Sequence, residues 1–165
     1  MNFNNLDELK QNGFKGFKTI KDLLLDSTVL PMTRGVYLVL NTNNKNVEFL
    51  STGSGGFFKG KNPNVSISEL EANWVDNTIA LYIGKAGGIN SQANLRSRLR
   101  QYLRFGQGKN VGHWGGRFIW QLRKSEDLII CWKELPNQDP REEELTIIKD
   151  FVRIYGKRPF ANLVN

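Results

Sequence analysis

The amino-acid sequence predicts a mixed α/β (α+β) fold with helices and a small mixed or antiparallel sheet. Short apolar runs at 36–40, 79–83 and 128–132 are typical of strands that are covered on both faces. Elsewhere apolar residues recur three and four positions apart, which is typical of amphipathic helices. The chain has 165 residues, a length that suits one domain, so we expect 1–165 to form a single unit.

The N-terminal residues, 1–33, are interpreted as a helical extension of the core. Apolar residues from Leu6 to Leu24 recur at helical spacing, which predicts two short helices within 5–30. Pro31 ends the second helix, because proline cannot continue a helical hydrogen-bond ladder. The core is then expected to occupy 34–162.

The first part of this core contains the signals of one strand and one short helix. Ser66 or Ser68 is expected to cap a helix that reaches Trp74, because a serine oxygen accepts hydrogen bonds from the first helical N–H groups. The preceding segments are expected to be a strand, a weaker strand and a glycine-rich loop, at 35–41, 47–50 and 52–63.

The second part of the core ends with the clearest helix signal of the chain. Asp139 followed by Pro140 is an N-cap with proline at the first helical position, and Gly156 ends the same helix after Tyr155. The segments before it are expected to be a strand, a loop, a helix, one helical turn and a strand that buries Cys131, at 79–84, 87–92, 93–104, 117–122 and 128–134.

The composition excludes several classes of protein. One cysteine, Cys131, excludes a disulfide framework and a cysteine-built zinc site, and one histidine, His113, excludes a centre with several histidine ligands. The N-terminus lacks the basic start and apolar run of a signal peptide, and no apolar run is long enough to cross a bilayer. We therefore expect a cytoplasmic protein with no membrane partner.

The net charge of +7 comes from a single stretch of the chain. Residues 1–80 are neutral, and 126–165 carry a net charge of −2. The 45 residues of 81–125 contain nine basic residues and no acidic one, with aromatic residues between them. An acid-free basic block with interleaved aromatics predicts a nucleic-acid partner. The alternative is a solvated basic surface that only keeps the protein in solution.

One arginine of this block differs from its neighbours. On a helical wheel of 93–104, Arg98 lies beside Tyr102 at the border of the apolar stripe, whereas Arg96, Arg100 and Arg104 fall on the outer face. An arginine next to a packed face requires an anionic partner or a cleft, because an unpaired buried charge is costly. Arg98 is therefore a candidate site residue.

Glu144 breaks the pattern of the last helix. It lies at the centre of the apolar stripe, whereas Glu142 and Glu143 fall on other faces. The alternative interpretation is that it complements the helix dipole in the first turn. One inward carboxylate without a second acidic cluster predicts a single Mg²⁺ or Mn²⁺ ion, held mostly by water and substrate phosphate.

The sole histidine lies in a glycine-rich loop beside Trp114, and two interpretations of it stay open. His113 either contacts a phosphate or a water near the site, or it is packed in the loop with its ring bonded to the backbone. Trp114 and Trp120 are interpreted as core residues rather than as platforms for stacking bases.

Five segments, in this order, resemble the GIY-YIG nuclease superfamily. Two strand segments are similar to the halves of its signature, and the others are similar to its arginine helix, its metal-binding glutamate helix and its terminal asparagine segment. The match covers about 34–162. The matching residues are Gly35-Val36-Tyr37, Tyr82-Ile83-Gly84, Asn94 to Tyr102, Glu144 with Ile147, Ile148 and Lys149, and Pro159-Phe160-Ala161-Asn162.

The resemblance implies metal-dependent hydrolysis of DNA phosphodiester bonds on a three-stranded antiparallel sheet. It implies that a tyrosine, with Tyr37 the first choice and Tyr82 the second, takes a proton from the attacking water. It also implies that Arg98 holds the scissile phosphate and that Glu144 anchors Mg²⁺ or Mn²⁺. The catalytic residues that it implies are Tyr37, Tyr82, Lys85, Arg98, Tyr102 and Asn162.

The basic block adds the residues that we expect to contact double-stranded or branched DNA. The resemblance further implies that Lys85 binds phosphate or lowers the pKa of a tyrosine, and that Asn162 closes the site by hydrogen bonding. The remaining contacts are expected from Arg96, Arg100, Arg104, Lys109, His113 and Arg117.

The sequence departs from the family pattern in the spacing of the two signature strands. Tyr37 and Tyr82 are 45 residues apart, so an insertion at about 42–78 takes the place of a short hairpin. This insertion is expected to serve as a lid, a DNA-reading element or a contact between copies, of which a dimer is one form. A catalytically silent nucleic-acid-binding module of the same fold is the alternative function.

Overall fold

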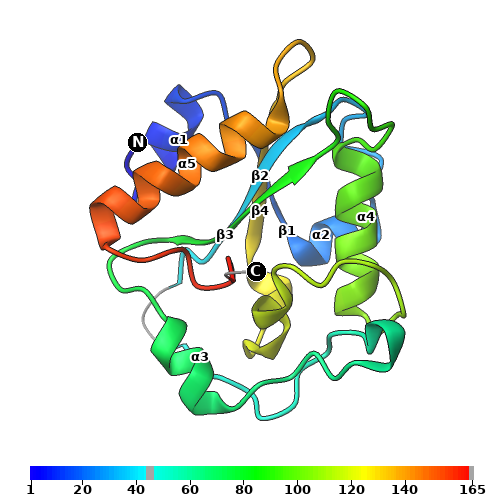
Figure 1. Ribbon diagram of the computed structural model, residues 1–165, viewed down its shortest axis with the longest axis vertical. Coiled ribbons are helices and arrows are strands. Elements are labelled where there is room, and N and C mark those ends of the chain that lie inside the picture. The colour runs from blue at the N-terminus through cyan, green and yellow to red at the C-terminus, as the bar shows by residue number, and fades with distance from the viewer. Residues whose placement is uncertain (44–46, 164–165) are drawn as a thin grey trace.

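The protein, described here by a computed structural model over residues 1–43 and 47–163, is built around one twisted antiparallel sheet (Figure 1). The strand order is β1-β4-β2-β3, so the edges of the sheet are β1 and β3. β4 and β3 pair with the two sides of β2 in register, which places Tyr37 between Trp132 and Gly84. The strands are β1 (Lys15–Thr19), β2 (Gly35–Leu40), β3 (Ala80–Ala86) and β4 (Ile129–Glu134).

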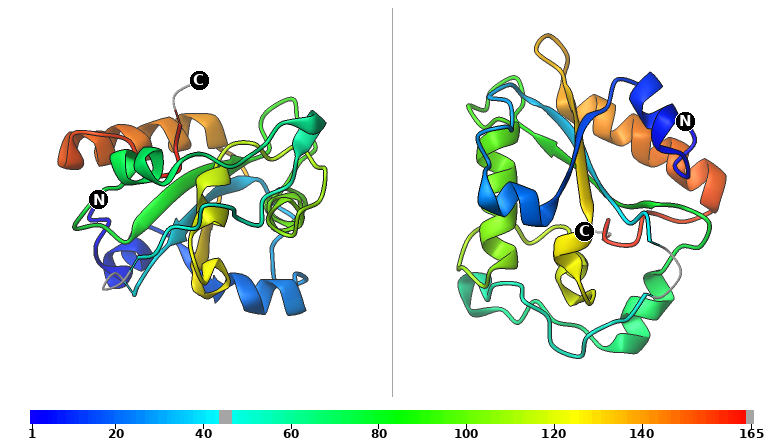
Figure 2. Two further views of the ribbon diagram at one scale, coloured as in Figure 1. Left: turned by 90° about the horizontal axis from the view of Figure 1, so that it is seen from below. Right: turned by 180° about the vertical axis from the view of Figure 1, so that it is seen from behind.

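Helices cover both faces of the sheet, as Figures 1 and 2 show from three directions. On one face, α1 and α5 pack on Val36, Leu38 and Ile83. On the other face, α2 and α4 pack on Tyr37 and Val39, together with the turn η2. The helices are α1 (Leu6–Gln11), α2 (Ile20–Leu25), α3 (Ile67–Asn73), α4 (Leu95–Gly106) and α5 (Pro140–Tyr155), with short 3₁₀ turns η1 (Phe58–Gly60), η2 (Arg117–Gln121) and η3 (Ser125–Asp127).

This arrangement confirms a mixed α+β fold but corrects the expected number of strands. The sheet has four strands rather than three, because residues 15–19 of the N-terminal segment pair with β4. The extension at 1–33 is therefore not purely helical. Its side chains also complete the core, since Phe3, Leu9 and Ile20 are fully buried.

The extra strand is irregular, which is why its sequence pattern was misleading. Gly16 and Phe17 both have positive φ angles, and the register with β4 shifts between Lys15 and Lys18. This bulge removes the alternation of apolar and polar residues that indicates a strand. Gly16 lies against the ring of Trp132, where a Cβ atom would come within 2.3 Å of the ring. Only glycine fits this position.

The helix boundaries follow the capping signals of the sequence. Ser66, rather than Ser68, caps α3, and Asp139 with Pro140 starts α5, which ends at Gly156 in a left-handed conformation. Asn94 caps α4 in a capping box with Ser97. Residues 117–121 form the expected helical turn, and Cys131 is buried in β4. The weak strand expected at 47–50 is only one bridge, between Phe49 and Leu122.

The insertion at 42–78 is fastened to the core through the side chain of Gln121. This amide is buried and donates to the backbone oxygens of Leu50 and Val65 over 3.0 and 2.9 Å, while it accepts from the N–H of Val65 over 2.9 Å. The N–H groups of Leu50 and Ser54 also donate hydrogen bonds to backbone oxygens of η2. In the described residues no helix is both long enough and apolar enough to cross a membrane.

We expect Gln121→Leu to destabilise the protein because it leaves three half-buried backbone groups of the insertion without the partners that Gln121 supplies. Each unpaired buried group costs about 1–3 kcal/mol, so the free energy of unfolding should fall by at least about 2 kcal/mol. Urea unfolding measures this difference. Gln107→Leu is the matched control, because Gln107 is exposed at the C-cap of α4. Equal effects of the two substitutions would contradict the anchoring role of Gln121.

Candidate functional site: a cleft at the edge of β3

A cleft of about 500 Å³ runs along β3 where α4 and α5 approach this edge strand from opposite faces of the sheet. Residues that lie far apart in the sequence meet in it. It is lined by Tyr82 and Lys85 of β3, Gly87, Gly88, Asn90, Ser91 and Ala93 of the following loop, Arg98 of α4 and Glu144 of α5. The cleft therefore contains four of the seven residues expected for catalysis and metal binding.

Asn162 acts on the backbone of β3 rather than inside the cleft. Its side-chain amide donates to the oxygen of Ile83 and accepts from the N–H of Ile83, both over 2.8 Å. Ile83 lies between Tyr82 and Gly84, so this pair of bonds fixes the strand at the point where Tyr82 enters the cleft. The bonds are consistent with the expected closing role of Asn162.

Glu144 is half-buried at the cleft and has no hydrogen bond or ion pair within residues 1–43 and 47–163. Its neighbours on the helix differ, since Glu143 pairs with Lys133 over 2.7 Å and Glu142 is exposed. Burial raises the pKa of the Glu144 carboxyl, although Lys85, Arg158, Arg141 and Arg98 oppose this rise. A half-buried carboxylate without a fixed partner is suited to bind a cation.

Arg98 is half-buried and reaches the cleft from the first half of α4. Its Nη1 donates to Gln101 Oε1 over 2.7 Å and to the backbone oxygen of Gly112 over 3.2 Å. No acidic side chain forms an ion pair with it in the part of the chain that the structure describes. The guanidinium is therefore held in place by neutral groups and keeps its charge for an anionic ligand.

Tyr82 and Tyr37 lie at different depths. Tyr82 is 8% exposed and lines the cleft, whereas Tyr37 is 0% exposed and lies behind it, with the two ring centres 6.0 Å apart. Burial raises the pKa of Tyr82 to about 12, against the opposing effects of Arg98 and a hydrogen bond with Tyr37. Burial likewise raises the pKa of Tyr37 well above its usual value. Only Tyr82 is in a position to contact a ligand in the cleft.

Two further residues complete a buried polar cluster behind Tyr82. Tyr102 donates its hydroxyl to the oxygen of Gly116 over 3.1 Å, and its ring stacks on His113 with centres 4.2 Å apart. His113 is fully buried, so it does not contact a nucleic acid on the surface of this structure, contrary to one of its two interpretations. Its ring bonds to Tyr37 rather than to the backbone, with 3.2 Å between Nε2 and Oη.

The other basic residues expected to bind DNA divide into those that contact other parts of the protein and those that are exposed. Arg96 donates to the backbone oxygens of Thr28 and Leu30, and Arg100 donates to Ser27, so both fasten the segment before β2 to α4. Arg117 lies 4.6 Å over the ring of Trp114 and is half-buried. Arg104 and Lys109 are exposed and have no ion-pair partner among the described residues, so they remain available to phosphates.

A second groove continues from the cleft along α4. Its volume is about 580 Å³, and it shares Ala93 and Arg98 with the cleft. Arg100, Gln101, Arg104 and Val111 line the rest of it. The two hollows together form one path that passes from Glu144 over Arg98 to the C-terminal end of α4.

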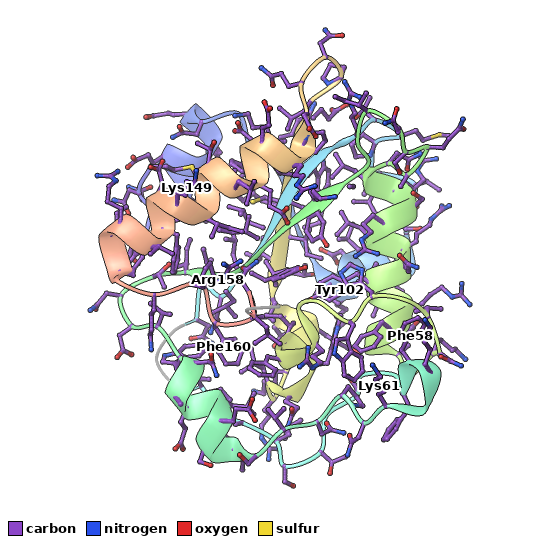
Figure 3. The ribbon with its side chains drawn as sticks, viewed as in Figure 1. Phe58, Lys61, Tyr102, Lys149, Arg158 and Phe160 are labelled. Carbon is purple, nitrogen blue, oxygen red and sulfur yellow. The ribbon has the colours of Figure 1, made fainter. Side chains whose placement is uncertain are left out.

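The insertion forms the far end of this path. Phe58 packs on Gly112, where a Cβ atom would lie 3.3 Å from the ring, and the N–H of Lys59 donates to Asn110 over 3.2 Å. Figure 3 shows Phe58 and Lys61 beside the lower end of α4. The insertion thus supports the loop at 107–116, which in turn holds Arg98. We did not predict the roles of Gln101, Gly112 and Gln121, and only the spacing of Gln101 three residues after Arg98 was a usable signal.

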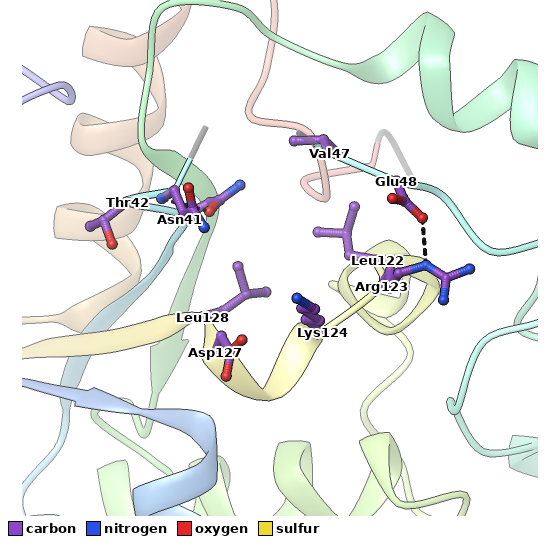
Figure 4. A pocket seen from close by; sticks show the side chains of 10 residues that line it. Asn41, Thr42, Val47, Glu48, Leu122, Arg123, Lys124, Asp127 and Leu128 are labelled. Carbon is purple, nitrogen blue, oxygen red and sulfur yellow. Dashed lines mark hydrogen bonds and ion pairs between the residues drawn. The ribbon is translucent and has the colours of Figure 1, made fainter. Parts of the chain in front are cut away.

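A smaller hollow of about 90 Å³ lies elsewhere, between the end of β2 and the segment before η3 (Figure 4). Its one ion pair, between Arg123 and Glu48, is more than half exposed and contributes little stability. None of the residues expected for catalysis lines this hollow.

Comparison with known proteins gives no further guide to the site, since no family model, curated protein or solved structure matches the chain. A search of the described residues for three or more histidine, cysteine, aspartate or glutamate side chains around one point also finds none. Among the described residues that line the cleft, Glu144 is the acidic one.

The buried histidine gives a testable dependence of stability on pH. Burial and the charge of Arg98 hold the pKa of His113 well below 6.5. The unfolded chain therefore binds one more proton than the folded protein once the pH falls below about 6.5. We expect the free energy of unfolding to decrease as the pH falls through this range, by up to about 1.4 kcal/mol per pH unit.

Urea unfolding of the wild type and of His113→Gln at about pH 7.5 and pH 5.5 isolates the contribution of His113 to the pH dependence of stability. The two proteins share all other titrating groups. We expect the wild type to lose more stability on acidification than the variant. An identical loss in both proteins would show that the ring titrates normally in the folded state.

Proposed function

We propose that this chain is a metal-dependent endonuclease of the GIY-YIG type that hydrolyses phosphodiester bonds in DNA. The observation that carries the proposal is the convergence of Tyr82, Lys85, Arg98 and Glu144 on one cleft. They come from three different elements, β3, α4 and α5. Tyr82, Arg98 and Glu144 lie far apart in the sequence, so we interpret their meeting in one cleft as a shared function. Apart from Glu144 the group is cationic or phenolic, which suits a phosphate ligand.

In the proposed reaction the scissile phosphate lies against Arg98. The guanidinium binds its oxygens and offsets the negative charge that they gain as water attacks the phosphorus atom. Tyr82 must first lose its own proton to solvent; as a phenolate it then accepts a proton from the attacking water. The bond between phosphorus and the leaving oxygen breaks, and a solvent water protonates the leaving oxygen. Lys85, which is half-buried in the same cleft, supplies a second positive charge beside the phosphate.

The residues of the cleft fit a single divalent ion, Mg²⁺ or Mn²⁺, at Glu144. The carboxylate is half-buried and unpaired in the described residues, and the space around it admits water and phosphate oxygens. When bound, such an ion supplies Lewis-acid stabilisation of phosphate charge and lowers the pKa of coordinated water. Since Glu144 itself raises the pKa of Tyr82, compensating its charge also favours Tyr82 as the proton acceptor.

This assignment replaces Tyr37 with Tyr82 as the proton acceptor. Tyr37 is fully buried and does not line the cleft, so no water in the cleft contacts its hydroxyl directly. Burial raises the pKa of Tyr37 well above its usual value, and the neighbouring phenols of Tyr82 and Tyr102 add to this rise. We assign Tyr37 and Tyr102 to the support of Tyr82.

The surface around the cleft supports DNA as the ligand. Apart from Glu144, the residues that line the cleft and the groove all come from 81–125, which contains no acidic residue. Residues 49–68 contain none either, and Phe58 of this segment packs on Gly112. Exposed Arg104 and Lys109 lie on one segment, and exposed Lys59 and Lys61 lie on the other. A path of one sign of charge that leads to Arg98 is the arrangement expected for a phosphate backbone.

One observation favours the second candidate, a catalytically silent DNA-binding module. With a pKa of about 12, Tyr82 is protonated at neutral pH unless a ligand or an ion adds positive charge. A protein that only binds DNA would need the basic path but would not need added positive charge at Tyr82.

We expect Glu144→Gln and Arg98→Ala each to reduce cleavage of plasmid and branched DNA in Mg²⁺ or Mn²⁺ by about 100-fold or more. The first removes the carboxylate for the metal, and the second removes the cation for the phosphate. Glu142→Gln is the matched control, because Glu142 lies in the same helical turn but is exposed. Gel analysis of the products over time gives the rates.

Two outcomes would count against hydrolysis. Intact wild type that leaves linear, supercoiled and branched DNA uncut in both metals, yet binds DNA in EDTA, would establish the silent module. Equal rates for Glu142→Gln and Glu144→Gln would remove Glu144 from the proposed site.

The charged path predicts a specific change in the salt dependence of binding. We expect Lys59→Gln/Lys61→Gln to weaken DNA binding and to reduce the slope of log affinity against log salt by up to about 2, because each phosphate contact contributes about 0.9. Fluorescence anisotropy measures this slope, with cleavage prevented by Glu144→Gln. Lys18→Gln/Lys21→Gln is the control outside the groove. If both pairs lower the slope equally, the insertion is not part of the path.

A further inference from the structure

The only histidine of the chain is the one residue of the polar cluster that the proposed reaction leaves unused. His113 is 0% exposed, stacks on Tyr102 at an angle of 23°, and lies with Nε2 at 3.2 Å from Tyr37 Oη. Its other ring nitrogen, Nδ1, is buried and has no hydrogen-bond partner among residues 1–43 and 47–163. A buried ring with one bonded nitrogen and one unbonded nitrogen requires an explanation.

We propose that His113 is a positioning residue: its Nε2–H donates to Tyr37 Oη and so directs the Tyr37 hydroxyl proton toward the oxygen of Tyr82. This inference rests on the proposed function, in which Tyr82 takes a proton from water. His113 itself touches neither the cleft nor the reacting atoms.

The direction of the bonds follows from counting protons in the cluster. A neutral imidazole carries one N–H, and Tyr37 carries one O–H. If Tyr37 donated to Nε2, the ring proton would lie on Nδ1 and remain buried without an acceptor. If Nε2 donates to Tyr37, the proton of Tyr37 is free to bond to Tyr82, and Nδ1 carries no proton. The second arrangement leaves no N–H of the ring unpaired, which makes it the less costly of the two.

This direction has a consequence for Tyr82. A phenol oxygen that accepts a hydrogen bond from Tyr37 is stabilised as it becomes negative, because the bond strengthens toward the charged form. The proton that Tyr82 carries points away from Tyr37, into the cleft. The same bond is among the influences that lower the pKa of Tyr82.

The loop that carries His113 also fixes the phosphate-binding arginine. The N–H of His113 bonds to the oxygen of Val111 over 2.9 Å, which bends the loop so that the Gly112 oxygen accepts from Arg98 over 3.2 Å. The short segment 111–113 therefore contacts both Tyr37, which supports the proton acceptor Tyr82, and Arg98, which binds the phosphate. Phe58 of the insertion packs on this segment at Gly112.

Because the chain has a single histidine, its ring can be observed without assignment. In ¹⁵N-histidine-labelled protein at neutral pH, NMR of the imidazole nitrogens is expected to show the proton on Nε2 and none on Nδ1. Tyr37→Phe removes the acceptor and should shift the Nε2 resonance of His113, whereas Tyr155→Phe, outside the cluster, should not. A proton on Nδ1 would overturn the proposal, whether or not the protein cuts DNA.

Cleavage kinetics give the second test. His113→Leu is expected to lower kcat about tenfold, a factor equivalent to about 1.4 kcal/mol, with KM for DNA unchanged. His113→Gln restores a donor at the position of Nε2 and should recover most of kcat. Tyr37→Phe should match His113→Leu, and the double variant should lose no more than either alone. If His113→Leu fails to fold, Tyr37→Phe with His113→Gln carries the test.

Two results would assign His113 a purely structural role. One is a kcat for His113→Gln as low as that of His113→Leu while both proteins fold. The other is full additivity of the His113 and Tyr37 substitutions. In either case the dependence of cleavage on Glu144 and Arg98 would stand by itself.

Discussion

The arrangement of the cleft depends on how closely the ring of Tyr37 approaches the backbone of β3. Tyr37 and Gly84 are direct partners in the β2–β3 register, and a Cβ atom at position 84 would come within 2.4 Å of Tyr37 Cζ. The ring fills the space that any other residue at 84 would occupy. Tyr37 is therefore held close to the backbone of β3, behind Tyr82, which lines the cleft. In this position the Tyr37 hydroxyl reaches His113. Gly84 of β3 is thus a packing requirement of Tyr37 in β2.

Much of this site could be predicted from the pattern of single helices. Glu144 was placed on the inner face of its helix and Arg98 at the edge of another, and both line the cleft in the structure. These predictions worked because a helix has a fixed periodicity, so one charged residue among apolar ones can be recognised locally. The helix caps at Ser66 and Asp139 followed from the same kind of local rule.

Other features could not be read locally because they depend on contacts between distant segments. The strand at 15–19 contains a bulge, and only its pairing with β4 identifies it. Tyr37 and Tyr82 contact α4 and the loop at 107–116 through Tyr102, His113 and Gly116, and these contacts cannot be read from the pattern of β2 or β3 alone. His113 showed no periodic pattern, and its burial arises from stacking on Tyr102. Sequence reasoning therefore found charged residues on helices and missed the polar contacts of loops.

The two edge strands of the sheet, β1 and β3, are protected from pairing with other chains in different ways. An exposed edge strand offers unpaired N–H and C=O groups, which can template the addition of a further strand and lead to aggregation. At β3 the amide of Asn162 occupies both backbone groups of Ile83. At β1 the bulge at Gly16 and the flanking Lys15 and Lys18 disrupt a straight edge. The cleft thus lies beside a strand edge whose backbone groups at Ile83 are not free to capture another polypeptide.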